Sequence, residues 1–373
     1  MRRHGLLLLT LLTAACHSTN SPIVIHWQQS SQLPDEGNGA NLGIAGPITG
    51  ILKDYLIIAG GANFPEDKPW NGGAKIYQQQ GYLYRIQDKQ LHFEKHIHVP
   101  YVKAYAANVS YENKLFVLGG EDQQGPSASA GYYSINEKQE LEYHPLQNLP
   151  KHLSNTGGAY LNNYLYVVGG DNSEEVSNMV FRLDVSKENS QWEEFMELPY
   201  SLSHAVVSEN GKDCIYVAGG RKRNVQAPST FYQDVLAIQT KDRKVEKIAE
   251  LPVAVSAGTG IFYRDHLLLF SGDDGQTFHQ VEKALINISQ ADNLHKKDSL
   301  IALKNNILEQ HPGFTKSCWS LNLKDQTWRS VEAIPGMGPV TTTAIKHQDM
   351  LIIPSGEVKA GVRTNQILTA TLK

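Results

Sequence analysis

The sequence predicts an all-β fold, a closed β-propeller of six blades. Two observations support this prediction. Apolar runs that end in Gly-Gly or Ser-Gly recur six times along the 373-residue chain. From one run to the next, the first residue of the pair advances by 59, 50, 50, 52 and 84 residues. A period near 50 residues indicates a repeat architecture in which each repeat forms one blade.

The six runs share an apolar strand followed by small residues, which permit close approach of neighbouring backbone. They cover residues 55–61, 115–120, 165–170, 215–220, 267–272 and 351–356. A further strand is expected after each run, as at 231–238, and several repeats then end in Leu-Pro. Trp192 and Trp328 occupy the tryptophan position before that end. This order of features is typical of Kelch-type propellers.

The two ends of the chain are expected to close the ring. The last predicted strand, at 364–372, is not followed by a tryptophan strand, whereas the strand predicted at 23–27 carries Trp27 and is followed by Leu33 and Pro34. The N-terminal strand is therefore predicted to complete the sixth blade, which removes an open sheet edge. The propeller is predicted to span 23–373.

The N-terminus predicts export. Residues 1–15 combine a basic start, a short apolar run and small residues, which is typical of a secretory signal peptide. Cys16 directly after two alanines resembles the lipobox of bacterial lipoproteins, so residues 16–22 are expected to form a lipidated cysteine and a tether. The predicted location is the periplasm, with a lipid anchor in a membrane. An ordinary signal peptide with an incidental cysteine is the alternative.

Composition argues against several other classes of protein. The formal net charge is −4, so no overall basic field indicates nucleic-acid binding. Beyond Cys16 the chain has only Cys214 and Cys318. Two cysteines do not form a disulfide framework, and no Cys/His spacing predicts a zinc site. We expect two unpaired buried thiols, with a single bridge between them as the alternative.

The residues after the six pairs are expected to surround one mouth of the ring, because the preceding strands all end at the same face. They are Ala62-Asn63, Glu121-Asp122, Asp171-Asn172, Arg221-Lys222-Arg223, Asp273-Asp274 and Glu357-Val358-Lys359. Loops on a rigid scaffold commonly carry function. Two of these loops are enlarged, at 62–77 and at about 276–316, and apolar spacing predicts helices over 281–288 and 299–308. Both enlarged loops flank the sixth blade, whose loop is the predicted site.

The sixth loop brings an acid and a cation together. Glu357 ends one predicted strand and Arg363 begins the next. Because paired strands lie about 4.8 Å apart, the two side chains should be neighbours at the mouth. A hairpin ion pair without a chemical role is the alternative, and would contribute at most ~1 kcal/mol if exposed.

This loop, Ser-Gly-Glu-Val-Lys-Ala-Gly-Val-Arg-Thr, resembles the Gly-Glu-x-x-x-Gly-x-Arg-Thr loop of the N-acetylneuraminate epimerases, the sialic-acid mutarotases of the bacterial periplasm. The helical insertion before it and the loop over 60–75 are also similar to that family. In the usual family order the latter loop follows the Glu/Arg blade, whereas here it opens the chain. The order resembles a cyclically permuted branch, which a ring with adjacent ends tolerates.

The resemblance implies an isomerase that interconverts the anomers of a sialic acid. It implies that Glu357 and Arg363 are the catalytic residues. We expect Glu357 to act as the acid/base and Arg363 to bind the substrate carboxylate or steady developing charge. Weaker candidates for contacts with the sugar are Asn63, Lys75, Glu121 and Arg221, each of which has a solvated loop residue as its alternative interpretation. Such a reaction requires no metal, nucleotide or redox cofactor. The sequence leaves the sugar and the oligomeric state open.

The sequence also allows other interpretations. His204 and His279 lie near strand ends and could act as a second acid/base, whereas Asp273-Asp274 is expected to serve as a turn. A non-catalytic Kelch lipoprotein that binds a glycan or a protein is the main alternative function. A copper radical oxidase would need a Cys–Tyr cross-link and histidine ligands, which Cys214 and Cys318 do not offer. A glycosidase would need two carboxylates at a defined separation, which the sequence does not establish.

Overall fold

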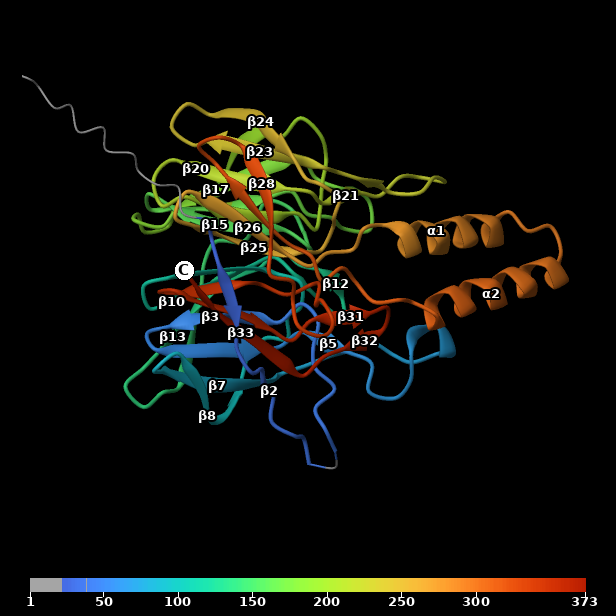
Figure 1. The fold of residues 1–373 in the computed structure, drawn as a ribbon, viewed down its shortest axis with the longest axis horizontal. Helices are drawn as coiled ribbons and strands as arrows, with labels where there is room; N and C mark the ends of the chain where they lie inside the picture. Colours follow the sequence, from blue (N-terminus) through green and yellow to red (C-terminus); the bar gives the residue numbers. More distant parts are fainter. Residues whose placement is uncertain (1–21, 38) are drawn as a thin grey trace, which may run out of the picture.

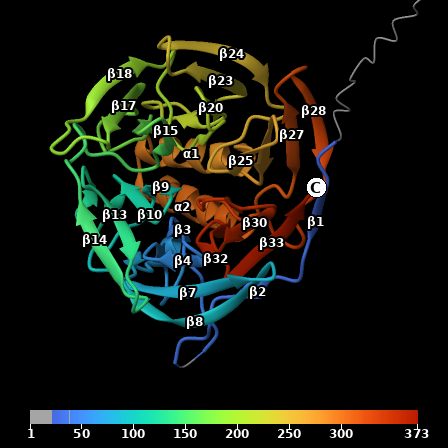
Figure 2. The same cartoon turned by 90° about the vertical axis from the view of Figure 1, so that its left-hand side faces the viewer.

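The computed structural model describes residues 22–37 and 39–373, which form a six-bladed β-propeller (Figure 1). Figure 2 shows the blades arranged around a central axis, with helices α1 (Gln276–Ser289) and α2 (Leu294–Glu309) behind the centre. The predicted all-β fold with a helical insertion is therefore confirmed. The predicted export signal and Cys16 lie outside the described residues and stay predictions.

Each of the first three blades is an antiparallel sheet of four strands in chain order. Blade one contains β3 (Ile48–Leu52), β4 (Tyr55–Ala59), β7 (Gln80–Gln87) and β8 (Gln90–His98). Blade two contains β9 (Ala107–Tyr111), β10 (Lys114–Leu118), β13 (Ala130–Ile135) and β14 (Leu141–Pro145). Blade three contains β15 (Gly157–Leu161), β16 (Tyr164–Val168), β17 (Met179–Asp184) and β18 (Glu193–Glu197).

The next two blades repeat the arrangement, and the sixth is built from both ends of the chain. Blade four contains β19 (Val206–Glu209), β20 (Cys214–Ala218), β23 (Asp234–Gln239) and β24 (Lys244–Glu250). Blade five contains β25 (Thr259–Tyr263), β26 (His266–Phe270), β27 (Cys318–Asn322) and β28 (Thr327–Val331). Blade six contains β29 (Ile345–His347), β30 (Met350–Pro354), β33 (Gln366–Leu372) and β1 (Ile25–Trp27), with β2 (Ser31–Gln32) also on β33. The strand expected over 231–238 thus begins only at Asp234.

The N-terminal strand closes the ring, as the sequence predicts. β1 pairs antiparallel with β33, with Ile25 opposite Leu372 and Trp27 opposite Ala370. The Trp27 indole N–H also donates to the carbonyl of Glu332, just beyond blade five, at 3.1 Å. The last sheet is therefore completed by residues from the opposite end of the chain, and β1 covers the outer edge of β33.

Hydrophobic clusters hold the blades together, with one cluster at each of the six seams between neighbours. The second strand of each blade lies between two seams, so both of its faces are covered. This explains why these strands are continuous apolar runs in the sequence rather than alternating ones. Cys214 starts the second strand of blade four and Cys318 starts the third strand of blade five, and both are buried free thiols, as expected.

The glycine pairs are required where one blade meets the next. At Gly169 the backbone has φ of +60°, and a Cβ there would lie 2.3 Å from the Leu202 carbonyl oxygen of the following blade. Ser271 and Ser355 take the same position in blades five and six with φ of 56° and 54°. Their hydroxyls donate to backbone carbonyls, and Ser355 bonds Ile44 at 2.9 Å. These bonds offset the strain of a side chain at positive φ.

Backbone hydrogen bonds also run around the axis in a closed cycle through one residue of each blade, which we call the collar. The collar residues are Gly46, Tyr105, Asn155, His204, Ala257 and Thr341. Each N–H donates to the carbonyl of the collar residue in the preceding blade, at 2.7 to 3.0 Å. All six residues have φ between 51° and 63°. The collar therefore fixes six side chains at one level of the axis.

Helices α1 and α2 form a hairpin that projects from the mouth of the ring (Figure 1). They include the stretches predicted over 281–288 and 299–308 and are longer at both ends. α1 is attached to blade four, where Glu282 accepts hydrogen bonds from the N–H and hydroxyl of Ser229. The end of α2 is attached to blade one, where Glu309 accepts from Lys68 and Trp70. In the described part of the chain, no helix combines the length and apolar character that crossing a membrane requires.

Candidate active site

The residue that follows each pair is held at the mouth by a short antiparallel bridge. These residues are Ala62, Glu121, Asp171, Arg221, Asp273 and Glu357, opposite Ala45, Ala104, Ser154, Ser203, Ser256 and Val340. Every bridge partner directly precedes a collar residue, so the six positions are equivalent around the axis. The prediction that these loops surround one mouth is confirmed. Four of the six side chains are ionisable groups that line one cavity: Glu121, Arg221, Asp273 and Glu357.

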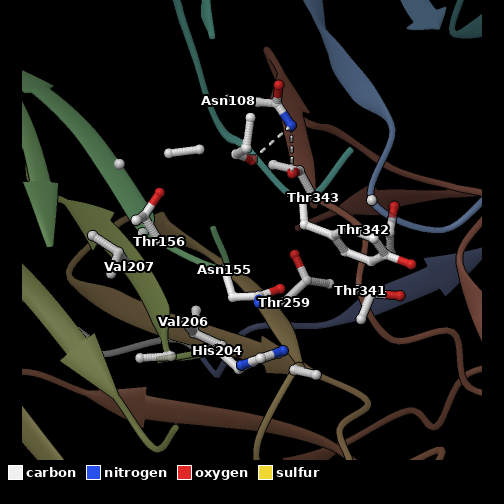
Figure 3. A pocket seen from close by; sticks show the side chains of 18 of the residues that line it. Asn108, Asn155, Thr156, His204, Val206, Val207, Thr259, Thr341, Thr342 and Thr343 are labelled. Carbon is white, nitrogen blue, oxygen red and sulfur yellow. Dashed lines mark hydrogen bonds between the residues drawn. The ribbon is translucent and has the colours of Figure 1, made fainter. Parts of the chain in front are cut away.

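Two cavities lie along the axis, on either side of the collar. The mouth cavity, of about 440 Å³, is lined by the loops and by both helices. The axial channel, of about 130 Å³, is lined by the inner strands. Figure 3 shows the channel, where collar residues Asn155, His204 and Thr341 lie near Thr156 and Thr259. Of these two cavities, the mouth cavity has the size of a small-ligand site, which is typically ~300–1,000 Å³.

Glu357 lies in the wall of the mouth cavity on a two-stranded hairpin, β31 (Glu357–Lys359) and β32 (Val362–Arg363). Its Oε1 accepts a hydrogen bond from the Gly361 N–H at 2.7 Å and lies 3.3 Å from Arg363 Nη1. The predicted pairing of Glu357 with Arg363 is therefore present. Burial raises the pKa of Glu357, and the Arg363 charge and the Gly361 N–H oppose that rise.

Arg363 lies behind Glu357 and does not line the cavity. Its side chain is 5% exposed, compared with 19% for Glu357. The guanidinium stacks over the Phe64 ring at 4.6 Å, and its Nε donates to the Ala62 carbonyl at 3.4 Å. These contacts direct the cation against blade one and beside the Glu357 carboxylate.

The first and second blades contribute a cation and an acid that neutralise each other. Lys75 Nζ lies 2.6 Å from Glu121 Oε1, which also accepts from the Tyr77 hydroxyl at 2.7 Å. Both Lys75 and Glu121 line the mouth cavity. Asn63 does not line this cavity. Its side-chain amide is buried, where it donates to the Gly43 carbonyl and accepts from the Gln78 side-chain amide. Asn63 thus stabilises the enlarged loop from behind.

Arg221 is the cation of blade four at the cavity wall, and a chain of polar contacts leads away from it. Its Nη2 lies 3.5 Å from His204 Nε2, and His204 Nδ1 lies 2.9 Å from Ser203 Oγ. The Ser203 hydroxyl donates to Asp171 Oδ2 at 2.9 Å. A guanidinium only donates and an ionised carboxylate only accepts, so this chain assigns the His204 proton to Nδ1. The guanidinium also stacks over the Phe278 ring of α1 at 4.4 Å.

His204 is a poor candidate for the second acid/base. Burial, together with the Arg221 charge, lowers its pKa to about 3, although Asp171 opposes the shift. The imidazole is therefore neutral near pH 7 and serves as a fixed partner for Arg221. His279 does not line the cavity, because its Nε2 bonds the Ser229 carbonyl at 2.9 Å and attaches α1 to blade four.

The family model described as N-acetylneuraminate epimerase matches residues 146–373, more than half of the chain. The chain belongs to the N-acetylneuraminate epimerase family. It is 28% identical over 229 residues to the N-acetylneuraminate epimerase of Salmonella typhi and 22% identical over 221 residues to that of Haemophilus influenzae. These alignments cover 60% and 58% of this chain. The chain spans 58% of the Salmonella relative and 56% of the Haemophilus relative.

A solved structure, that of YjhT, shares the fold. It superposes with a TM-score of 0.63 at 16% identity and covers 92% of this chain and 100% of the other. The likeness supports the six-bladed ring. It does not test the order of the blades along the chain, so the cyclic permutation stays a prediction for this member of the N-acetylneuraminate epimerase family.

Several residues at the cavity were not singled out by the resemblance to the epimerase family. Trp70, Tyr105, Phe278 and Phe314 supply its aromatic surface, and Asp273 supplies a carboxyl. Tyr105 has one sequence signal, because each collar residue lies 14 or 15 positions before its pair. Burial raises the Tyr105 pKa to about 12, so its hydroxyl stays protonated. Within the described residues, no group of three or more His, Cys, Asp or Glu side chains is placed to hold a metal ion.

Proposed function

We propose that this protein is a mutarotase that interconverts the α and β anomers of N-acetylneuraminate or a closely related sialic acid. The observation that carries the proposal is the Glu357 carboxyl. It faces a cavity of ligand size, its pKa is raised by burial, and Arg363 and the Gly361 N–H hold it in place. A carboxyl with a raised pKa is suited to both taking and returning a proton near neutral pH.

Mutarotation of a 2-keto sugar acid opens the ring and closes it on the other face. One group removes the proton of the anomeric hydroxyl while the C2–O6 bond breaks and O6 receives a proton. Rotation about the C2–C3 bond then presents the opposite face of the C2 carbonyl to the O6 hydroxyl. Closure reverses both proton transfers. Glu357 exchanges the proton of the anomeric hydroxyl in this scheme, a role that contributes on the order of 10²–10⁴-fold.

Arg221 is the proposed partner of the substrate carboxylate. Within the mouth cavity, Lys75 is already paired with Glu121 at 2.6 Å, and Arg363 is shielded behind Glu357. The Arg221 guanidinium lines the cavity and is oriented by His204 and by the Phe278 ring. A guanidinium can bind a carboxylate through two parallel hydrogen bonds. Trp70 and Phe314 offer apolar surface for the sugar ring.

The decisive measurement follows α-N-acetylneuraminate by NMR immediately after its release by a sialidase. Wild-type protein is expected to hasten the appearance of the β anomer over buffer, and Glu357→Gln is expected to lose about 10²–10⁴-fold of that enhancement. Glu194→Gln, on the exposed outer strand of blade three, serves as the matched control and should retain the wild-type rate. A wild-type rate equal to that of buffer would refute the mutarotase and favour a non-catalytic glycan-binding protein.

A further inference from the structure

The proposed reaction leaves one proton transfer without a residue. Glu357 exchanges the proton of the anomeric hydroxyl, but O6 must gain a proton when the ring opens and lose it when the ring closes. Residues of both helices line the cavity beside the loops, so protein side chains surround the space in which O6 would lie. A second ionisable side chain in the cavity wall would serve the transfer directly.

Most ionisable groups in the cavity wall are unsuited to this task. His204 has a pKa of about 3, and Tyr105 has one of about 12. Glu121 is engaged by Lys75 and by Tyr77. His311 accepts a hydrogen bond from the Gly313 N–H at its Nδ1, and burial lowers its pKa. Asp273 is the carboxyl that remains among the described residues.

Asp273 occupies in blade five the position that Glu357 occupies in blade six. Asp273 pairs with Ser256 and Glu357 pairs with Val340, each just before a collar residue. Those two collar residues are joined directly, because the Thr341 N–H donates to the Ala257 carbonyl at 2.9 Å. The two carboxyls therefore lie on neighbouring blades, at equivalent places in one wall of the mouth cavity.

One oxygen of Asp273 is committed to structure and the other is available. Oδ1 accepts the Gly275 N–H at 2.9 Å, which shapes the turn before α1. Within the described part of the chain, Oδ2 has no hydrogen-bond partner. The sequence prediction of a turn residue is thus confirmed for one oxygen, while the other can face a ligand.

We propose that Asp273 is the second proton-transfer group of the mutarotase, acting at O6 while Glu357 acts at the anomeric hydroxyl. This inference rests on the proposed function. On opening, Glu357 takes the hydroxyl proton, C2=O forms, the C2–O6 bond breaks, and O6 takes the proton of Asp273. On closing, O6 attacks C2 and returns its proton to Asp273, and the carbonyl oxygen takes the proton of Glu357. The cycle leaves both carboxyls as they began.

Burial and their mutual charge act on both carboxyls of the wall in the same direction. Burial raises the pKa of Asp273, and the neighbouring Asp274 raises it further, whereas Arg221, His279 and the Gly275 N–H lower it. The charge of Asp273 in turn contributes to the raised pKa of Glu357. Among the other charged or titratable groups nearby, His311 lies in the same wall, with its pKa lowered. Two interacting carboxyls titrate in separate steps that belong to the pair.

The experiment is the pH dependence of the mutarotation rate for Asp273→Asn. Asparagine keeps an acceptor for the Gly275 N–H and removes the titrating group. We expect the wild-type rate to depend on pH in a bell-shaped curve. In Asp273→Asn this curve should lose one limb, and the maximal rate should fall about 10²–10⁴-fold below that of wild type. The remaining limb should move to lower pH, because the negative charge that raises the Glu357 pKa is gone. Binding of N-acetylneuraminate, followed by ligand-observed NMR, should persist.

Asp274→Asn is the matched control. Asp274 also shapes the start of α1, accepting from the Gln276 N–H at 3.0 Å, but it does not line the mouth cavity. Its profile should keep both limbs. Asp273→Glu, which restores a carboxyl, should recover the lost limb and part of the rate even if asparagine weakens the fold.

The outcomes separate the two proposals. If wild type is no faster than buffer, the proposed function fails and the role of Asp273 fails with it. If wild type is active and Asp273→Asn keeps a two-limbed profile near the wild-type rate, the mutarotase stands and the role of Asp273 is refuted. If Asp273→Glu folds like wild type but recovers neither the limb nor any of the rate, Asp273 is not the proton-transfer group.

Discussion

The mouth cavity and the axial channel share the collar but differ in the side chains that surround them. The mouth cavity has long ionisable and aromatic side chains, such as Arg221, Glu357 and Trp70. The channel is lined mainly by glycine, alanine, threonine and valine. The inner strands converge so closely that a Cβ on Gly157 would lie 2.0 Å from Val207 of the next blade.

The difference shows that in this ring the chemistry is confined to the loops by geometry. Inner strands near the axis have room only for small side chains, whereas loops beyond the collar diverge and can carry large ones. A substitution at the mouth is therefore expected to change the reaction, and a substitution in the channel to leave the reaction unchanged. Three substitutions test this division beyond those already described.

The largest effect is expected for Arg363→Met, which removes the cation behind Glu357. Breaking a buried ion pair from one side is expected to lower the free energy of unfolding by about 3 kcal/mol. The pKa of Glu357 should rise further, so the limb of the rate profile that depends on its ionisation should move to higher pH. A carboxyl whose pKa is higher in the folded than in the unfolded protein stabilises the fold at low pH. That contribution is lost as the pH rises through the pKa of the folded state. The destabilisation should therefore grow with pH.

Urea denaturation at several pH values, together with pH–rate profiles, measures both effects of Arg363→Met. Arg363→Lys keeps a cation and should give an intermediate result. An unchanged profile and unchanged stability would show that the pair does not tune Glu357, and would weaken the separation of mouth from channel.

A smaller effect is expected for Arg221→Met, which should raise KM for a sialic acid. A hydrogen bond to a charged group contributes about 1.5–3 kcal/mol, equivalent to roughly 10–100-fold in affinity. The control is Arg223→Met, because Arg223 bonds the carbonyls of Asn172 and Ser173 outside the cavity. Equal KM values for the two variants would contradict the assignment of Arg221 to the substrate carboxylate.

The smallest effect is expected for Thr156→Val in the channel. The Thr156 hydroxyl is buried without a hydrogen-bond partner among the described residues. Its replacement by a methyl group should change the free energy of unfolding by less than ~1 kcal/mol, toward higher stability, and leave the rate unchanged. Thr259→Val should instead lower the free energy of unfolding by about 1–3 kcal/mol. The Thr259 hydroxyl accepts a hydrogen bond from the buried Ala344 N–H, which would be left without a partner. Thermal denaturation distinguishes the two, and a loss of activity in Thr156→Val would contradict the division.

The blade positions could be predicted from the sequence because each depends on a local pattern, an apolar run and a small-residue pair. The pairing of Glu357 with Arg363 was predictable for the same reason, since both lie on one short hairpin. The direction of the Arg363 guanidinium was not. It is set by Phe64 and Ala62, which are about 300 positions away in the sequence and reach it only through ring closure.

The collar escaped prediction because its residues contradict local preference. Positive φ favours glycine and, to a smaller extent, asparagine and histidine, yet Tyr105, Ala257 and Thr341 adopt the same backbone conformation as Gly46. Their conformation is imposed by hydrogen bonds between blades. The sequence also did not indicate the proposed proton-transfer role of Asp273. An aspartate two positions before Gly275 is already explained by its turn hydrogen bond to the Gly275 N–H.

The closed cycle of the collar makes the pocket a property of the finished molecule. With five blades docked, one collar N–H and one collar C=O at the gap would have no partner, and unpaired backbone groups away from water are unfavourable. The base of the mouth cavity is complete only when the sixth blade docks and its strands from the two ends of the chain pair. A nascent polypeptide thus has no functional pocket until its assembly is over.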